Sequence, residues 1–149
     1  MGNLPPYTYD ERLQGGELRV LTVMAGVFGT PLVCSLDRAR VLSAKPFDAL
    51  SYVWGDRSNT VELQIDGKAL VVTTSVCEAL QHLRSPQELL HIWIDQVCIN
   101  QDDIEERNAQ VQQMHTIYQR AECTYIWFGP AQPRLESALQ IVLQICGGA

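Results

Sequence analysis

The chain has 149 residues, of which 46% are hydrophobic and 19% are charged, so it can form one globular domain with a buried core. Its formal net charge of −6 argues against a general nucleic-acid binder, which would carry a basic stripe, and we expect no DNA partner. No unbroken apolar run approaches about 18 residues and the N-terminus lacks an apolar signal region, so we expect a cytoplasmic protein without a membrane span.

The first half of the chain is predicted to be rich in strands. An alternating apolar run after Gly15-Gly16 predicts a strand at about 18–23. Further strands are expected at about 33–36 and 48–53. Two β-rich runs flank Asp66-Gly67, a dipeptide that strongly favours a two-residue hairpin turn.

The second half is predicted to alternate helices with strands. Ser75 and Glu78 have the spacing of a capping box, which predicts a helix over 74–84. The later elements are a buried strand at 91–95, a helix from Asp102 or Asp103 to about Ala121, a strand at 123–129 and a last helix over 133–149. Such alternation implies parallel strands joined by helices. We therefore predict an α/β fold, with a mainly parallel sheet flanked by helices and an additional antiparallel β-hairpin portion.

Polar side chains follow the predicted parallel strands. In open α/β sheets, ligands bind beyond the carboxyl ends of the strands. Those ends are Trp54–Arg57, the segment from Asp95 onward and Gly129-Pro130. The sequence therefore predicts a polar crevice where these ends meet.

The helix that follows Asp103 carries charge on its predicted buried face. A rotation of about 100° per residue places Arg107 on the face shared by Val111, Met114, Ile117, Tyr118 and Ala121, with Glu106 at its edge. A guanidinium is costly to bury without a partner, so Arg107 is expected to pair with Asp95. This pair could belong to a ligand site, or it could simply lock the helix to the strand.

Two further kinds of site, a cysteine nucleophile and a metal site, are compared with a purely structural role for the same residues. Five cysteines without paired spacing indicate reduced thiols. Cys98 could be a nucleophile, but spacing places no histidine beside it, and a buried thiol is the default. Carboxylates near Asp95 and Asp102 could hold Mg²⁺, but they do not fit an EF-hand loop and favour helix capping, so we predict no metal site.

Three long motifs resemble those of a known family. They are "LSYVWG" at 50–55, "WIDQVCINQ" at 93–101 and "ERNAQVQQM" at 106–114. On these motifs the chain resembles the fungal heterokaryon incompatibility (HET) domain from about Tyr7 to Gly129. Family members are usually longer, so the resemblance implies a single HET domain over 1–149 that is truncated at its C-terminus.

The resemblance implies a role in fungal non-self recognition, where HET domains act as programmed-cell-death effectors, a form of innate immunity. The family is also similar to TIR domains, some of which cleave NAD at the nicotinamide–ribose bond with one glutamate. This implies an NAD glycohydrolase (NADase), with NAD as its substrate and no cofactor. The alternative is a non-catalytic, self-associating signalling module that forms an oligomer or filament. For both the enzyme and the signalling module, the expected partner is an unidentified upstream recognition protein.

The implied reaction assigns roles to particular residues. Loss of nicotinamide develops oxocarbenium character at the ribose, which a nearby carboxylate would stabilise. The catalytic candidates are Glu106 and Asp95, followed by Glu136, which stands at a place comparable to the TIR glutamate. The candidates for binding the nucleotide are Arg57 and Arg107 near its phosphates, Trp54 as an aromatic wall, and Gly55, Asp56 and Asn100.

Overall fold

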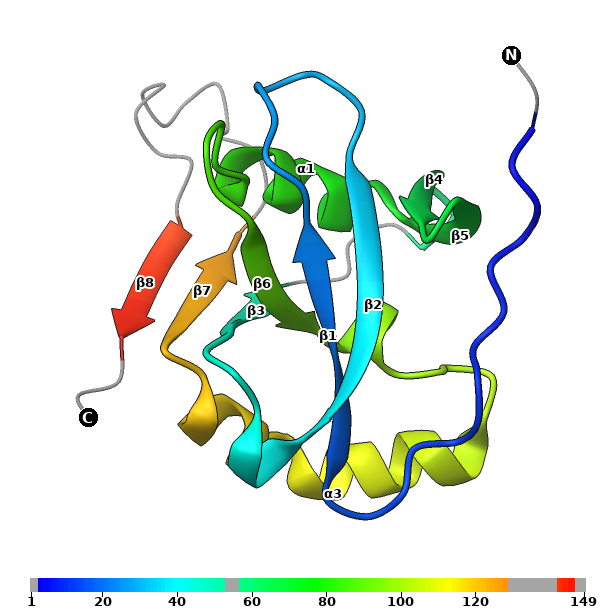
Figure 1. Cartoon of the computed structure of the whole chain (residues 1–149), viewed down its shortest axis with the longest axis vertical. Coiled ribbons are helices and arrows are strands. Elements are labelled where there is room, and N and C mark those ends of the chain that lie inside the picture. The colour runs from blue at the N-terminus through cyan, green and yellow to red at the C-terminus, as the bar shows by residue number, and fades with distance from the viewer. Residues whose placement is uncertain (1–2, 53–56, 129–141, 147–149) are drawn as a thin grey trace.

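The structure is a computed structural model, and it describes residues 3–52 and 57–128 together with the backbone of 142–146. Within these residues, one sheet has the strand order β5-β4-β2-β1-β6-β3-β7-β8 (Figure 1). The strands are β1 (Glu17–Val23), β2 (Val33–Arg40), β3 (Asp48–Tyr52), β4 (Thr60–Ile65), β5 (Lys68–Thr73), β6 (Leu90–Ile94), β7 (Cys123–Trp127) and β8 (Val142–Cys146). The helices are α1 (Thr74–Leu83), α2 (Asp95–Cys98) and α3 (Ile104–Arg120), with a 3-10 turn η1 (Val41–Ser43).

The sheet is mixed, although the α/β class is confirmed. β6, β3 and β7 run parallel, and β2 pairs with β4 in parallel. β1 is antiparallel to both of its neighbours, β2 and β6, and the β4–β5 and β7–β8 pairs are antiparallel. The prediction of a mainly parallel sheet is therefore wrong. Strand periodicity locates strands but does not say which strands become neighbours, and β1 inserts beside β6.

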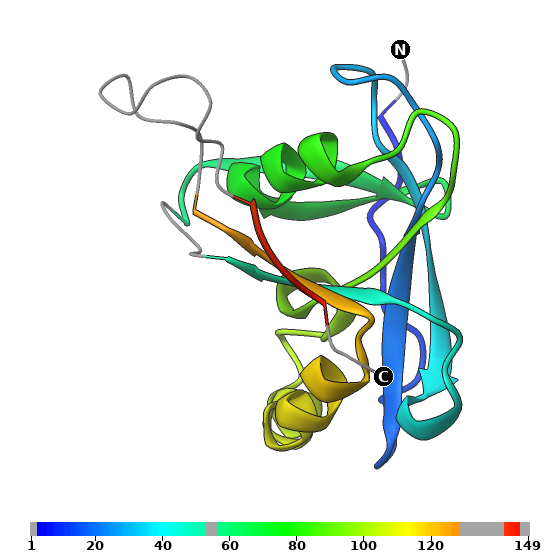
Figure 2. The same cartoon turned by 90° about the vertical axis from the view of Figure 1, so that its left-hand side faces the viewer.

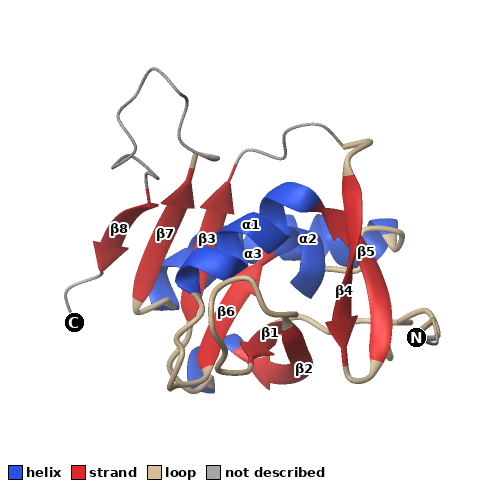
Figure 3. Ribbon diagram, turned by 90° about the horizontal axis from the view of Figure 1, so that it is seen from above, coloured by secondary structure: helices blue, strands red, loops and turns tan. Residues whose placement is uncertain are grey.

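The sheet curves around the helices. Figure 3 shows β4 and β5 to one side of the helices and β7 and β8 to the other, and Figure 2 shows α1 and α3 at different levels of the molecule. The core between them contains Val76 and Leu80 of α1 and Ile92, Trp93 and Ile94 of β6, all fully buried. No helix in the described part of the chain combines the length and apolar composition needed to cross a membrane.

Local signals located most of the elements correctly. The β4–β5 hairpin turns at Asp66 and Gly67, with φ of 52° and 75°, as a type I′ turn requires. Asp103 is the N-cap of α3, and its carboxylate accepts a hydrogen bond from the Glu106 amide at 3.2 Å. α1 begins at Thr74 as predicted, but the capping box at Ser75 is wrong, because Ser75 lies inside the helix and the N-cap is Thr73, which makes no side-chain cap hydrogen bond.

The predicted last helix over 133–149 is also wrong where the structure describes it. Val142–Cys146 is a strand that pairs antiparallel with β7. A short apolar run with β-branched residues is compatible with a helix or a strand. Here the edge of β7 supplies backbone hydrogen-bond partners, and the run forms a strand. The remaining residues of that prediction lie outside the described part of the chain.

Candidate functional site

A cavity of about 240 Å³ lies at the carboxyl end of β6, where the sequence predicts a ligand. We call it the β6 cavity. It brings together two of the predicted binding residues, Arg57 and Asn100. Its other lining residues come from the N-terminal segment, from β4 and β5, and from the segment after β6: Tyr9, Thr60, Leu70, Val71, Val72, Thr73, Gln96, Gln101 and Asp102.

The floor of this site is organised by Gln96, which was not predicted from the sequence. The side-chain oxygen of Gln96 accepts a hydrogen bond from the Thr73 amide at 2.6 Å. Its Nε2 donates to the Tyr52 hydroxyl at 2.8 Å and to Thr73 Oγ1 at 3.2 Å. One buried amide therefore joins the ends of β3, β5 and β6. The signal that could have found it is an amide placed directly before the apolar residues Val97 and Cys98.

Asp95 begins α2 directly after β6 and is half-buried. One of its carboxylate oxygens accepts a hydrogen bond from the backbone N–H of Gln96 at 2.7 Å. Its backbone carbonyl accepts one from Gln101 Nε2 at 2.9 Å. Burial, reinforced by the Asp95 carboxylate, raises the pKa of Tyr52 and raises the pKa of Tyr118 to about 12. Both phenols are therefore protonated well above neutral pH, and neither competes with Asp95 as an anion at this strand end.

Glu106 lies in a different environment, because it is 1% exposed and forms a bidentate pair with Arg19. Its Oε1 accepts from Arg19 Nη2 at 3.0 Å and from the Leu13 amide at 3.0 Å. Its Oε2 accepts from Arg19 Nη1 at 2.9 Å and from the Asn100 amide at 2.6 Å. Burial alone would raise the pKa of Glu106, but these donors outweigh it and lower the pKa. Both oxygens are occupied within the protein, and Glu106 does not line the β6 cavity.

Arg19 is the buried guanidinium that faces Glu106, at 2% exposure. Besides Glu106, it donates to the Cys98 carbonyl at 3.1 Å and lies 4.8 Å from the centre of the Tyr9 ring. Its role was not predicted from the sequence. The signal that could have found it is a charged residue in the interior of β1, between Leu18 and Val20.

Arg107 is exposed, so its predicted pairing with Asp95 on a buried face of α3 is wrong. The buried residues of the helix are Glu106, Gln110 and Ile117, whereas Val111 is 57% exposed. The helical projection from the sequence assumed that the apolar residues of α3 face the core. In the structure two polar residues point inward, because Glu106 finds Arg19 and Gln110 Nε2 donates to the Glu17 carbonyl at 2.8 Å.

The N-terminal segment closes the site from outside, running from beside β5 to the start of α3 (Figure 1). Tyr7 donates its amide to the Ala69 carbonyl of β5 at 2.8 Å, and the Tyr9 hydroxyl donates to the Val97 carbonyl at 2.6 Å. Arg12 pairs with Asp103 at 2.7 Å and lowers its pKa. This segment therefore places Tyr9 in the wall of the β6 cavity.

The remaining predicted site residues fall outside the described part of the chain. They are Trp54, Gly55, Asp56 and Glu136.

The thiols follow the sequence prediction except at one position. Cys34, Cys77 and Cys98 are free. Cys123 is disulfide-bonded, which corrects the expectation that every cysteine is reduced. Cys98 is fully buried, and burial raises its pKa to about 12, so this thiol is unsuited to act as a nucleophile at neutral pH. No group of His, Cys, Asp and Glu side chains among the described residues is arranged to hold a metal ion.

The fold and cavity define the class: an α/β protein with a cavity of mixed polar and apolar lining at the carboxyl end of a strand. Residues 47–145 match the family described as heterokaryon incompatibility protein (HET). The chain is also 39% identical over 120 residues to heterokaryon incompatibility protein 6, OR allele, of Neurospora crassa, an alignment that covers 72% of this chain and 18% of the relative. No solved structure matches the chain. The chain therefore belongs to the HET family, and it spans less than a fifth of that relative's length.

Proposed function

We propose that the chain is the effector part of a heterokaryon incompatibility protein and that its β6 cavity binds a nucleotide. Membership of the HET family and the name of the Neurospora relative support the biological role. The convergence of Arg57 and Asn100 at the carboxyl end of β6 carries the ligand assignment, because strands of an α/β sheet bind ligands at that end.

The described cavity suits part of a dinucleotide. Its 240 Å³ is smaller than the roughly 300–1,000 Å³ of sites that enclose a drug-sized ligand. Arg57 supplies a guanidinium that matches a phosphate in charge and shape. The Tyr9 ring offers an apolar surface beside it, since its hydroxyl is already bonded to Val97. On this proposal the phosphate lies toward Arg57 and the ribose toward α2.

The proposed reaction is hydrolysis of NAD at the nicotinamide–ribose bond. The bond from ribose C1′ to the pyridinium nitrogen breaks, nicotinamide leaves as a neutral molecule with the bonding electrons, and water adds to C1′ and loses a proton. A carboxylate near C1′ would stabilise the oxocarbenium ion formed between these events.

We assign that carboxylate to Asp95 in preference to Glu106. Neither residue lines the β6 cavity, but Asp95 is half-buried at the strand end, directly before the lining residue Gln96. Glu106 already binds four donors and is sealed from solvent, so its role on this proposal is to hold Arg19, the N-terminal segment and the Asn100 turn together.

The test is nicotinamide release from NAD by the purified chain, at low and high protein concentration. We expect Asp95→Asn to lower the rate by about 100-fold or more, in the range for loss of a group that stabilises a transition-state charge. Asp66→Asn is the control, because Asp66 is an exposed hairpin residue whose φ of 52° asparagine tolerates. A wild-type chain that is inert at both concentrations would exclude the enzyme, and an active Asp95→Asn variant would place the carboxylate elsewhere.

The outward face of α3 favours a second candidate, a self-associating module. Ile104 is 62% exposed and Val111 is 57% exposed, and they lie two turns apart on one side of the helix. Exposed apolar side chains in register along a helix suit a protein contact. An Ile104→Asp, Val111→Asp variant that loses both self-association and cell killing would favour this candidate. A variant such as Asp95→Asn that loses killing but keeps association would favour the enzyme.

A further inference from the structure

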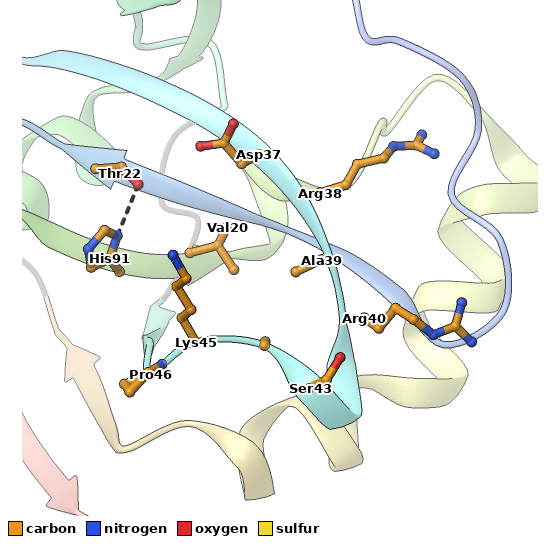
Figure 4. A pocket seen from close by; sticks show the side chains of 11 residues that line it. Val20, Thr22, Asp37, Arg38, Ala39, Arg40, Ser43, Lys45, Pro46 and His91 are labelled. Carbon is orange, nitrogen blue, oxygen red and sulfur yellow. Dashed lines mark hydrogen bonds between the residues drawn. The ribbon is translucent and has the colours of Figure 1, made fainter.

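A second and larger cavity, of about 480 Å³, lies against β1, β2 and the start of β6. We call it the β1–β2 cavity. It shares no lining residue with the β6 cavity. Its floor is apolar, from Val20 of β1 and Ala39 of β2, and polar side chains surround that floor (Figure 4). Nothing in the proposed reaction uses it.

Three cationic residues line this cavity, Arg38, Arg40 and Lys45, but Figure 4 shows both guanidinium groups extending away from it, so Lys45 supplies the positive charge over the floor. It lies in the loop between η1 and β3, and Figure 4 shows its ammonium directed over the cavity floor toward Val20 and His91. No hydrogen bond or ion pair joins the Lys45 side chain to any residue that the structure describes. The neighbouring Arg38 differs, since it pairs with Asp10 at 3.3 Å and its guanidinium extends away from the cavity.

His91 stands beside Lys45 in a fixed orientation. Its Nδ1 is 3.0 Å from Thr22 Oγ1, across the β1–β6 pairing in which these two residues are opposite each other. When the Thr22 hydroxyl donates to Nδ1, the neutral ring carries its proton on Nε2 and offers a donor there. A lysine ammonium above an apolar floor, with an imidazole at the edge of that floor, forms a receptor for one compact anionic group.

The rim of the cavity limits how much negative charge it accepts. Asp37 of β2 is exposed there and has no ion-pair partner among the described residues. Its carboxylate would repel a second anionic group and would accept hydrogen bonds from ligand hydroxyls. The chain as a whole carries a net charge of −6, so attraction of an anion must come from this local arrangement and not from the overall field.

We propose that the β1–β2 cavity binds a small organic molecule with one phosphate or carboxylate group, held by Lys45 and His91, and a hydroxylated body lying over Val20 and Ala39. Sugar monophosphates and sugar acids share this chemistry. The site is separate from nucleotide binding in the β6 cavity and does not depend on it.

The composition of the chain makes a direct test feasible. Lys45 and Lys68 are its only lysines, and Lys68 lies at the start of β5, away from the cavity. Reductive methylation with ¹³C-labelled formaldehyde keeps the positive charge and gives each lysine its own NMR signal. We expect ribose 5-phosphate to shift the Lys45 and His91 signals saturably, and to leave Lys68, His82 and His115 unchanged.

Three ligands separate the sources of the anionic group: ribose 5-phosphate, ribonate and neutral ribose. Saturable binding of either anion, with none of ribose, supports the proposal, and the tighter anion identifies the preferred group. Shifts of equal size at both lysines, shifts that do not saturate, or equal binding of ribose would overturn it.

Matched variants measured by calorimetry on unmodified protein complete the test. Lys45→Ala should weaken binding of the preferred anion by about tenfold or more, as expected for loss of one charged hydrogen bond. Lys68→Ala should leave the affinity unchanged. Lys45 is exposed and its side chain bonds to no described residue, so its loss should not alter the unfolding midpoint. Unchanged affinity in a folded Lys45→Ala protein would contradict the proposal.

Discussion

The two longer helices bury opposite kinds of surface. α1 turns Val76, Ala79 and Leu80 inward, as an amphipathic helix should. The first half of α3 turns Glu106 and Gln110 inward and leaves Val111 in solvent, and its second half buries Ile117. Burial of α1 therefore follows from apolar area, whereas the first half of α3 depends on particular hydrogen-bond partners in β1 and the N-terminal segment. Attachment through buried hydrogen bonds is specific. Removing one partner lowers the stability sharply, because the other polar group is then buried without a partner.

Removing the Glu106 carboxylate should destabilise the protein more than any other single substitution proposed for these helices. Glu106→Ala leaves the buried Arg19 with only the exposed Asp10 carboxylate, 3.4 Å from Nη2, and should reduce the free energy of unfolding by about 3–5 kcal/mol. Urea denaturation measures this. The double variant Arg19→Met, Glu106→Leu should recover much of that loss, because neither side chain is then a buried unpaired charge. A cost in the double variant equal to the sum of the two single costs would contradict a coupled pair.

Acid should weaken the same pair without mutation. The folded-state pKa of Glu106 is lowered, so its contribution to stability is complete above the unfolded pKa of about 4.3 and is lost as the pH falls through the lower folded-state pKa. Urea denaturation between pH 7 and pH 3 should therefore show a fall in stability below about pH 4.3. In Glu106→Gln this fall should be shallower. Identical slopes in the two proteins would show that other carboxylates, such as Asp103, account for the acid sensitivity.

The end of α1 provides a smaller test of polar attachment. The Arg84 guanidinium donates to the Val27, Thr30 and Pro31 carbonyls and so holds the β1–β2 loop. A Cβ on Gly26 would lie 2.7 Å from Arg84 Nη1. Gly26→Ala should therefore cost about 1–3 kcal/mol through overpacking.

Gly15→Ala is the control for that substitution, because its Cβ would meet nothing within 4 Å and its φ is negative. Equal thermal midpoints for the two variants would show that Arg84 moves aside freely.

The exposed charges of α3 should matter least. Arg12 is 47% exposed where it meets Asp103, and a surface pair of this kind contributes little and is screened by salt. Arg12→Ala should lower the urea midpoint slightly at low ionic strength and not at all in 1 M NaCl. Arg107→Ala should leave the midpoint unchanged at either ionic strength, because the Arg107 side chain is exposed and bonds to no described residue. A larger loss for Arg107→Ala than for Arg12→Ala would reverse this assignment.

The sequence predicts those parts of the fold that local signals determine. Alternation in β1, the Asp66-Gly67 turn and the Asp103 cap each depend on a few neighbouring residues, and each prediction is confirmed. Strand order is different, because it depends on pairings between distant segments. The antiparallel position of β1 beside β6 and the strand at Val142–Cys146 both arise from such pairings.

Prediction of the candidate site has the same limit: local rules locate some of its residues, and the others depend on distant partners. The rule that ligands lie beyond strand ends led to Arg57 and Asn100, which line one cavity, and their role in binding a ligand stays a prediction. Gln96 and Arg19 were missed, because each is interpretable only once its distant partner is known. Arg107 was misplaced for the converse reason: apolar periodicity was allowed to orient α3, and Val111 contributes to that periodicity without being buried.

The location of Arg19 sets a lower limit on the segment that can be studied in isolation. Arg19 lies 87 positions before Glu106 and also before residue 47, where the family match begins. A protein trimmed to the matched segment would keep the glutamate and discard both its counterion and the Leu13 amide. During synthesis, Arg19 is made long before Glu106, so its guanidinium stays in contact with water until α3 has been made. Expression boundaries for this protein should therefore be drawn upstream of the first aromatic pair, Tyr7 and Tyr9.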